Sequence, residues 1–334
     1  MPWLKRVFAL VLLGVVLYFF LPLLSEFREA AGLFRYAHWQ WLFIAILIQV
    51  ISYGFLTWLN RLALSPFSGN IGFFQLGAVL TAMAFIQIAI PSGGASGAAL
   101  RVRLLRRYGY APEDSLFSLF VETFSELIAL ASVALLGVLY LLRSGSLTLV
   151  ELAWAVVALA ALSLLLFLGW RLLLDEGRSS RLLETIVRVW NRRLTRLRPL
   201  DGPELAQRLV NFRANLRRYR QVPAWKFVLA SFGKVILDVI SLGAGFALLG
   251  FTITPGTLFT GYGLILTFSG AAALPGGLAA SEAAVPVVFS WLRVPAALAL
   301  SAGLTYRLIA FWLVRFVGFF AWQYLESRPR TTHT

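Results

Sequence analysis

The feature that most constrains the fold is a break inside a hydrophobic stretch. Residues 274–286 read L-P-G-G-L-A-A-S-E-A-A-V-P, with long hydrophobic runs on both sides. Proline cannot continue a helical hydrogen-bond ladder, and two glycines loosen the backbone further. At membrane depth, non-helical backbone is tolerated only where it is buried in protein or lines a wet cavity. A helix restarting near Leu278 would present free N–H groups that favour an anion, and Glu282 follows one turn later.

A second break with the same residue types lies in the first half of the chain. Residues 90–101 read I-P-S-G-G-A-S-G-A-A-L-R, again directly after an apolar run. Two interrupted hydrophobic segments, one in each half, are typical of the site of a secondary transporter. The alternative interpretation is a pair of tight loops between ordinary helices.

The composition places these breaks in a membrane. Of the 334 residues, 59% are hydrophobic and 13% are charged, with a mean hydropathy of +0.79, which predicts an all-α polytopic membrane protein. The chain has no cysteine, which excludes disulfides, thiolate metal sites and cysteine nucleophiles. Its two histidines, His38 and His333, fall in a polar loop and in the tail. We therefore expect neither a metal nor a cofactor, and no catalytic residues.

Hydropathy predicts about six transmembrane helices and two re-entrant hairpins, in which a broken helix enters the membrane and returns to the same side. The predicted spans are 7–24, 41–64, 115–142, 147–174, 223–250 and 294–325. The predicted hairpins are 73–108 and 254–291, each containing one of the two breaks.

Residues 175–222 form the one long polar region, and arginine dominates its charge. Its second half predicts an amphipathic helix, which would lie on an anionic membrane surface or against the rest of the protein. The apolar face of that helix comprises Leu205, Leu209, Phe212, Leu216 and Tyr219. An RNA-binding segment is the sharper alternative, but in a membrane protein excess arginine marks cytoplasmic loops and anionic lipid first, so we expect no nucleic-acid partner.

The arginines also predict the topology. Most of the +15 net charge comes from arginine, and positively charged segments tend to stay in the cytoplasm. Both termini, residues 101–107 and residues 175–222 should therefore be cytoplasmic, in the plasma or inner membrane. All of these fit together only if 73–108 enters from the cytoplasm and returns to it, while 254–291 enters from outside.

This topology divides the chain into two halves of opposite orientation. Residues 1–146 contain two spans, the first hairpin and a third span, and residues 147–334 repeat that order with 175–222 inserted. Inverted repeats with paired broken helices place a binding site at their interface and permit alternating access.

Charged residues within the spans need a partner or a role, because each costs about 2.5–3.5 kcal/mol on insertion scales. Glu122 and Glu126 are four residues apart and share one helix face. One interpretation is that they line a cavity, where they attract cations or carry protons. The other is that they form structural pairs with arginines such as Arg101 or Arg307.

Five further charges lie in the second half. Lys234 and Asp238 are also four apart, which favours a structural pair. Arg307 lies mid-span and is the preferred phosphate ligand, because a guanidinium is a rigid fork that matches phosphate oxygens. Arg315, eight residues later, should face roughly the same way and is expected nearer the inner interface. Glu282 is either a ligand for a cationic head group or the cap of its own half-helix.

At these two breaks the sequence resembles the membrane domain of the lysylphosphatidylglycerol synthase/flippase family. The first family motif, similar to P-x-G-G-x-G-(acidic)-x-x-R-x-x-L-L, matches Pro91, Gly93, Gly94, Gly97, Arg101, Leu104 and Leu105. The second, similar to P-G-G-L-G-x-x-E-A, matches Pro275, Gly276, Gly277, Leu278, Glu282 and Ala283, and Tyr306-Arg307 fits as well. Two positions depart from the pattern: Ala98 replaces the frequent acid, and Ala279 replaces a glycine.

The resemblance implies movement of a lipid between leaflets rather than its synthesis, because 334 residues leave no room for the soluble aminoacyl-transferase domain. The expected substrate is a phosphate-bearing or aminoacylated lipid or glycolipid. The alternatives are a membrane enzyme or accessory subunit acting on lipid phosphates, and an anion or small-solute carrier. Membrane phospholipids are the expected partners, and a homo-oligomer is left open. The expected binding residues are Pro91, Ser92, Gly93, Gly94, Arg101, Glu122, Glu126, Pro275, Gly276, Gly277, Glu282 and Arg307.

Overall fold

The computed structural model describes residues 37–90, 94–143, 202–271 and 280–327, with a few isolated positions elsewhere. Every regular element in these ranges is helical. The elements are α2 (Gln40–Leu64), α3 (Phe73–Ala89), α4 (Ala95–Arg106), α5 (Pro112–Arg143), α8 (Gly202–Arg218), η2 (Tyr219–Gln221), α9 (Ala224–Leu248), α10 (Pro255–Ala271), α11 (Ala280–Trp291), α12 (Ala296–Arg307), η4 (Leu308–Leu313) and α13 (Val314–Ser327).

Four helices in the described ranges are long and apolar enough to cross a membrane: α2, α5, α9 and the continuous run from α12 to α13. They correspond to the predicted spans 41–64, 115–142, 223–250 and 294–325, so the chain is a multi-pass membrane protein. The predicted spans 7–24 and 147–174 lie outside the described residues.

Helices α3 and α4 pack against each other as a hairpin. The backbone N–H of Asn70, before α3, donates to the carbonyl oxygen of Tyr108, after α4, over 3.0 Å. The chain therefore enters and leaves this unit at the same end. At the break, the Ser96 hydroxyl donates to the carbonyl of Ile90 over 2.9 Å, and Gly97 faces the Gln87 side chain with no room for a Cβ. Gly97 in the first motif thus permits close approach of the two helices.

Helices α10 and α11 form a second packed pair around the other break. Gly261 on α10 lies against the ring of Phe289 on α11, again with no room for a Cβ. The Phe289 ring also contacts Phe246 of α9, with ring centroids 5.1 Å apart. Both predicted hairpins therefore contain two closely packed helices, and in each pair one glycine accommodates a large side chain of its partner.

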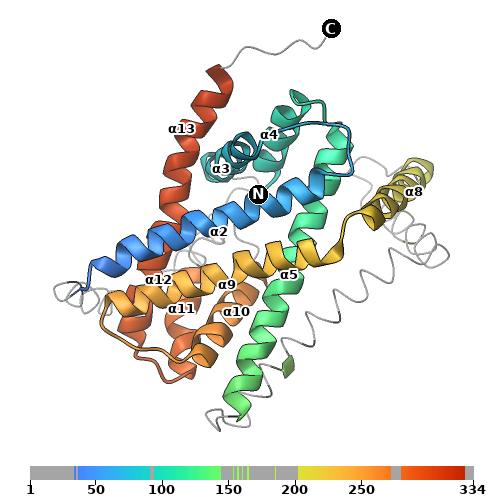
Figure 1. The fold of residues 1–334 in the computed structure, drawn as a ribbon. Helices are drawn as coiled ribbons and strands as arrows, with labels where there is room; N and C mark the ends of the chain where they lie inside the picture. Colours follow the sequence, from blue (N-terminus) through green and yellow to red (C-terminus); the bar gives the residue numbers. More distant parts are fainter. Residues whose placement is uncertain are drawn as a thin grey trace, which may run out of the picture.

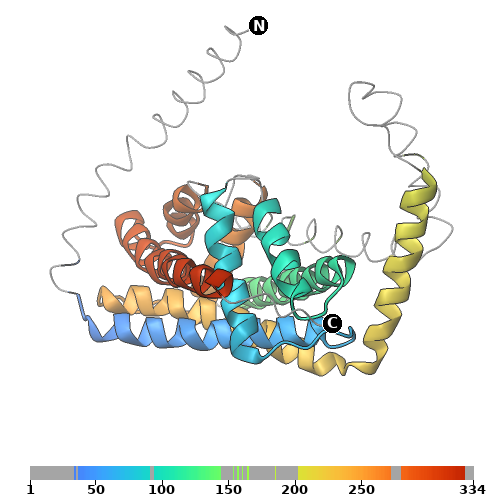
Figure 2. The same cartoon turned by 90° about the horizontal axis from the view of Figure 1, so that it is seen from above.

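The helices pack in matching pairs across the two halves of the chain. At the centre, α2 and α9 run side by side along their length (Figures 1 and 2). The first helix of each hairpin packs on the closing helix of the other half: α3 on α13, and α10 on α5. Glycines make both contacts close, because Gly318 of α13 meets the backbone of Thr81 and Gly137 of α5 meets that of Thr260.

The described end of the basic insert packs on the protein. Phe212 and Leu216 of α8 and Tyr219 of η2 lie against a core cluster that includes Phe117 of α5. The Phe117 and Phe212 ring centroids are 4.7 Å apart. Burial raises the pKa of Tyr219, so its hydroxyl stays protonated and donates to the carbonyl of Ala63. The amphipathic helix was predicted to lie either on a membrane surface or against the rest of the protein, and these described side chains pack against the protein. The rest of α8 projects from the bundle (Figure 2).

The last span, predicted over 294–325, contains an irregular turn. Residues Leu308–Leu313 form a π-helical turn between α12 and α13. A π-turn accommodates an extra residue and commonly occurs at functional sites. It rotates everything after it around the helix axis, which changes the direction of Arg315 relative to Arg307.

Candidate functional site

A polar cavity of about 430 Å³ lies between the two halves of the chain. Its walls come from α2, α5, α9, α10, α11, α12, the π-turn and α13, and half of its described lining residues are glycine, aliphatic or phenylalanine. Its polar lining residues are Gln49, Tyr53, Glu122, Glu126, Lys234, Asp238, Tyr262, Tyr306, Arg307 and Arg315. So many ionisable groups in a membrane protein indicate a functional site, because each is costly at membrane depth.

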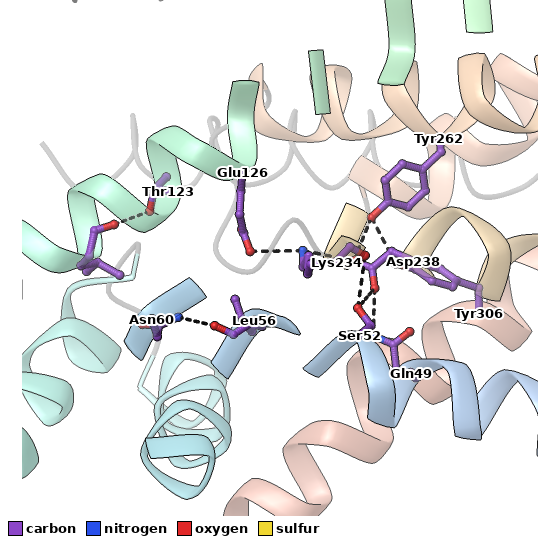
Figure 3. Close-up of polar contacts among 11 residues, drawn as sticks. Gln49, Ser52, Leu56, Asn60, Thr123, Glu126, Lys234, Asp238, Tyr262 and Tyr306 are labelled. Atoms are coloured by element: carbon purple, nitrogen blue, oxygen red, sulfur yellow. Dashed lines mark hydrogen bonds and ion pairs between the residues drawn. The ribbon is translucent and has the colours of Figure 1, made fainter. Parts of the chain in front are cut away.

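Asp238 of α9 is the centre of the polar network (Figure 3). Its Oδ1 accepts hydrogen bonds from Ser52 Oγ over 2.6 Å and from Gln49 Nε2 over 3.1 Å, both on α2. Its Oδ2 accepts one from the Tyr262 hydroxyl of α10 over 3.2 Å. The Tyr262 and Tyr306 hydroxyl oxygens are 3.4 Å apart, which extends the network to α12. Asp238 thus connects both halves through a fully occupied carboxylate.

Lys234 lies one helical turn before Asp238 and connects two carboxylates. Its Nζ is 3.1 Å from Asp238 Oδ2 and 3.6 Å from Glu126 Oε1 of α5 (Figure 3). The pairing predicted for Lys234 and Asp238 from their spacing is therefore present. The second contact, to Glu126, brings α5 of the first half to α9 of the second.

Arg101 and Glu122 form a buried ion pair behind the cavity wall. Arg101 is 0% exposed, and its Nη1 donates to Glu122 Oε2 over 2.7 Å while its Nη2 donates to Ser118 Oγ over 2.9 Å. Arg101 belongs to the first motif, so this contact connects α4 of the hairpin to α5. Structural pairing with Arg101, one of the two sequence interpretations of Glu122, is thus observed, and Glu122 also lines the cavity.

Arg307 and Arg315 both line the cavity and share the ring of Phe311. Their guanidinium carbons lie 4.6 Å and 3.2 Å from its centroid. In a regular α-helix, residues eight apart point about 80° away from each other. The π-turn adds about one residue, or about 100°, which brings the two directions within about 20°. Arg315 lines the same cavity as Arg307.

The predicted site residues divide into three groups. Glu122, Glu126 and Arg307 line the cavity, and Arg101 lies directly behind Glu122. Gly94 immediately precedes α4 with φ of 93°, a left-handed conformation that suits glycine. The positions outside the described residues are Pro91, Ser92, Gly93, Pro275, Gly276 and Gly277.

Glu282 can be located by its backbone. It lies in the first turn of α11, which runs antiparallel to α12 and contacts it where Val285 meets Gly303. Glu282 is three residues before Val285 on α11, and Tyr306 and Arg307 are three and four residues after Gly303 on α12. In antiparallel helices this places the backbone of Glu282 level with that of Tyr306 and Arg307. Val285 itself lines the cavity.

Sequence reasoning missed the aromatic and amide part of the cavity. The sequence assigned no role to Tyr53 or Tyr262, and Tyr306 entered only as part of a motif. Gln49 bonds between helices, to Asp238, and it lines the cavity as well. A tyrosine in an apolar span has no local signal that separates a cavity position from an interface position.

Comparison with known proteins agrees with the motif resemblance. A family model described as the lysylphosphatidylglycerol synthase TM region matches residues 7–318. This match confirms the resemblance found at the two breaks. No curated protein matches the chain.

Proposed function

This chain belongs to the family of the lysylphosphatidylglycerol synthase TM region, and we propose that it moves a phosphate-bearing lipid between the leaflets of a membrane. The observation that carries this proposal is the pair Arg307 and Arg315, turned toward one cavity on either side of a π-turn. Two guanidinium groups suit the oxygens of a phosphate better than two ammonium groups would, because each forms a planar fork of donors.

The cavity has the mixed character that a lipid head group requires. Its charged and tyrosine side chains can hold the phosphate and a polar substituent, while the aliphatic remainder of the wall tolerates the start of the acyl chains. A volume of about 430 Å³ fits a head group and leaves the tails in the bilayer. A carboxylate such as Glu126 can attract a positive group on an aminoacylated lipid.

The cross-packing of the helices supports an inverted repeat with re-entrant hairpins. In such a repeat, α3 is equivalent to α10, α5 to the run from α12 to α13, and α2 to α9. If α3 packs on α13, then α10 should pack on α5, and α2 should lie beside α9. The chain makes all three of these contacts. We propose that rearrangement of the contacts between these pairs exposes the cavity to each side in turn. The basic segments then lie in the cytoplasm, where 175–222 meets anionic lipid.

The partners of the carboxylates favour transport over chemistry on the lipid. Glu122 is bound to Arg101, and Asp238 to Lys234 and three uncharged donors. Glu126 is the one carboxylate of the described lining that is held less firmly, and a single carboxylate supplies neither a metal-binding cluster nor a nucleophile with its base. We therefore propose a transporter and not an enzyme, in a cell membrane with both termini cytoplasmic.

The test is lipid movement in vesicles reconstituted with the full chain. Inward-facing fluorescent phosphatidylglycerol should become accessible to an impermeant quencher faster than in protein-free vesicles, and mass spectrometry should recover it unchanged. Arg307→Gln and Arg315→Gln should each slow this by more than about tenfold, since each loses a charge-assisted contact of about 1.5–3 kcal/mol. Arg143→Gln, at the exposed end of α5, is the matched control.

Three other outcomes would each count against the proposal. Equal rates with and without protein would refute lipid movement. A chemically altered lipid would indicate an enzyme. Movement of a soluble anion such as inorganic phosphate, without movement of lipid, would indicate an anion carrier that uses the same arginines.

A further inference from the structure

The three carboxylates in the described lining of the polar cavity differ in how firmly they are held. Asp238 accepts three hydrogen bonds and pairs with Lys234 at 3.1 Å. Glu122 is paired with the fully buried Arg101 at 2.7 Å. Glu126 is different: among the described residues its nearest cation is Lys234 at 3.6 Å, and its Oε1 accepts no hydrogen bond. Its side chain is 26% exposed, on the cavity side.

Proton uptake by Glu126 would therefore disturb fewer polar contacts than proton uptake by Asp238 or Glu122. Protonating Asp238 would turn an acceptor of several hydrogen bonds into a partial donor, and protonating Glu122 would leave Arg101 as an uncompensated buried charge. Protonating Glu126 releases only one long ion pair. Lys234 keeps its closer contact with Asp238, so its charge stays compensated.

The net charge of the described cavity lining therefore changes most readily through protonation of Glu126. In the described lining, Glu122, Glu126 and Asp238 oppose Lys234, Arg307 and Arg315, and Arg101 lies behind Glu122. The titratable and charged groups around Glu126 are Tyr53 of α2, Arg101 of α4, Glu122 of α5, Lys234 and Asp238 of α9, Tyr262 of α10, Tyr306 and Arg307 of α12, and Arg315 of α13. When Glu126 takes up a proton, the cavity gains one positive charge, which strengthens the attraction of every cation in it for an anion.

We propose that Glu126 is a proton-binding site coupled to the binding of the anionic head group. This inference rests on the proposed function and adds its coupling ion. A proton from the aqueous phase bonds to the Glu126 carboxylate, the head-group phosphate binds at the arginines, and the proton leaves to water when the phosphate leaves. One proton and one phosphodiester charge move together, so the loaded cavity carries no added net charge across the membrane.

Coupling between two bound species is reciprocal, and this makes the proposal measurable at equilibrium. If the proton raises affinity for the phosphate, the phosphate must raise affinity for the proton. Binding of a phosphodiester should then draw about one proton from solution, and on the alkaline side of the titration affinity should fall by about tenfold per pH unit.

The experiment titrates the purified full chain calorimetrically with dihexanoyl phosphatidylglycerol, a soluble phosphodiester whose charge is constant across the pH range used. Repeating each titration in buffers of different ionisation enthalpy counts the protons taken up. Wild type should take up about one proton per ligand. Glu126→Gln, which mimics the protonated form, should take up none and bind with an affinity independent of pH.

Three measurements make the comparison decisive. Glu126→Asp keeps a titratable carboxylate and should retain proton uptake. Glu113→Gln removes an exposed carboxylate from the same helix and should behave as wild type. Melting temperatures establish that each variant is folded.

Proton uptake that persists in Glu126→Gln, or binding by wild type without proton uptake, would overturn the proton site and leave the lipid-transport proposal standing. Failure of wild type to bind the phosphodiester at any pH would overturn both. We expect proton uptake to disappear in Glu126→Gln and to persist in Glu126→Asp and Glu113→Gln.

Discussion

The buried pair of Arg101 and Glu122 predicts an asymmetry between two variants that remove one partner each. Arg101→Met leaves a carboxylate without its cation, and Glu122→Gln leaves a guanidinium without its anion. Breaking a buried pair from either side costs about 3–5 kcal/mol, because the remaining charge has lost its compensation. The Ser118 hydroxyl adds a charge-assisted hydrogen bond of about 1.5–3 kcal/mol, so Ser118→Ala should cost less than either.

The two variants should respond differently to pH. A buried carboxylate without a partner can neutralise itself by taking up a proton, whereas arginine stays charged throughout the accessible range. The stability of Arg101→Met should therefore recover as the pH falls, and that of Glu122→Gln should not. The double variant, which leaves no uncompensated charge, should be more stable than the less stable single variant.

The assay is thermal unfolding of the purified chain in detergent, followed by tryptophan fluorescence over a series of pH values. Arg106→Met, at the exposed end of α4, controls for loss of an arginine from that helix. The reasoning would be refuted if Arg101→Met melted with the control, or if the double variant were no more stable than the less stable single variant.

Three further predictions concern packing, the polar network and topology. Gly97→Ala should destabilise by about 1–3 kcal/mol, because its methyl group meets a facing glutamine, whereas Gly54→Ala, with open space around it, should be neutral or stabilising in the same melting assay. Tyr262→Phe removes a donor to the Asp238 carboxylate and should lower stability by about 1.5–3 kcal/mol, measured by the same melts. In this cysteine-free chain, Arg106→Cys should react with an impermeant thiol reagent only from the cytoplasmic side, and labelling from outside would exclude the first hairpin as drawn.

The helices were predictable because their causes are local. Apolar runs of about 25 residues specify α2 and α9, and α3 ends at Ala89, before Pro91, which cannot continue a helical hydrogen-bond ladder. The pairing of Lys234 with Asp238 follows from an i,i+4 spacing on one helix. Arg101 and Glu122 belong to neighbouring helices, and their pairing was one of two open interpretations.

The centre of the site depends on contacts that have no local signal. Gln49 and Ser52 bond to Asp238 across 189 and 186 residues of chain, and their sequence neighbourhoods resemble any other apolar span. The π-turn was also unpredictable from composition, since Leu308–Leu313 reads as ordinary helix. Arg307 was assigned to the cavity from sequence, but Arg315 was not, because its place late in the span suggested the inner interface.

The distribution of these contacts constrains how the cavity could open alternately to the two sides. Asp238 binds α2 through two short hydrogen bonds, so the α2–α9 pair is the firmest polar connection between the halves. The contact from Lys234 to Glu126 of α5 is longer, at 3.6 Å, and it crosses to the helix that carries α10. A motion that keeps the strong polar contacts must therefore keep α2 with α9, and α4 with α5 through the Arg101–Glu122 pair. Such a motion most readily stretches the contact between Lys234 and Glu126. Protonation of Glu126 would weaken that contact and so favour the motion.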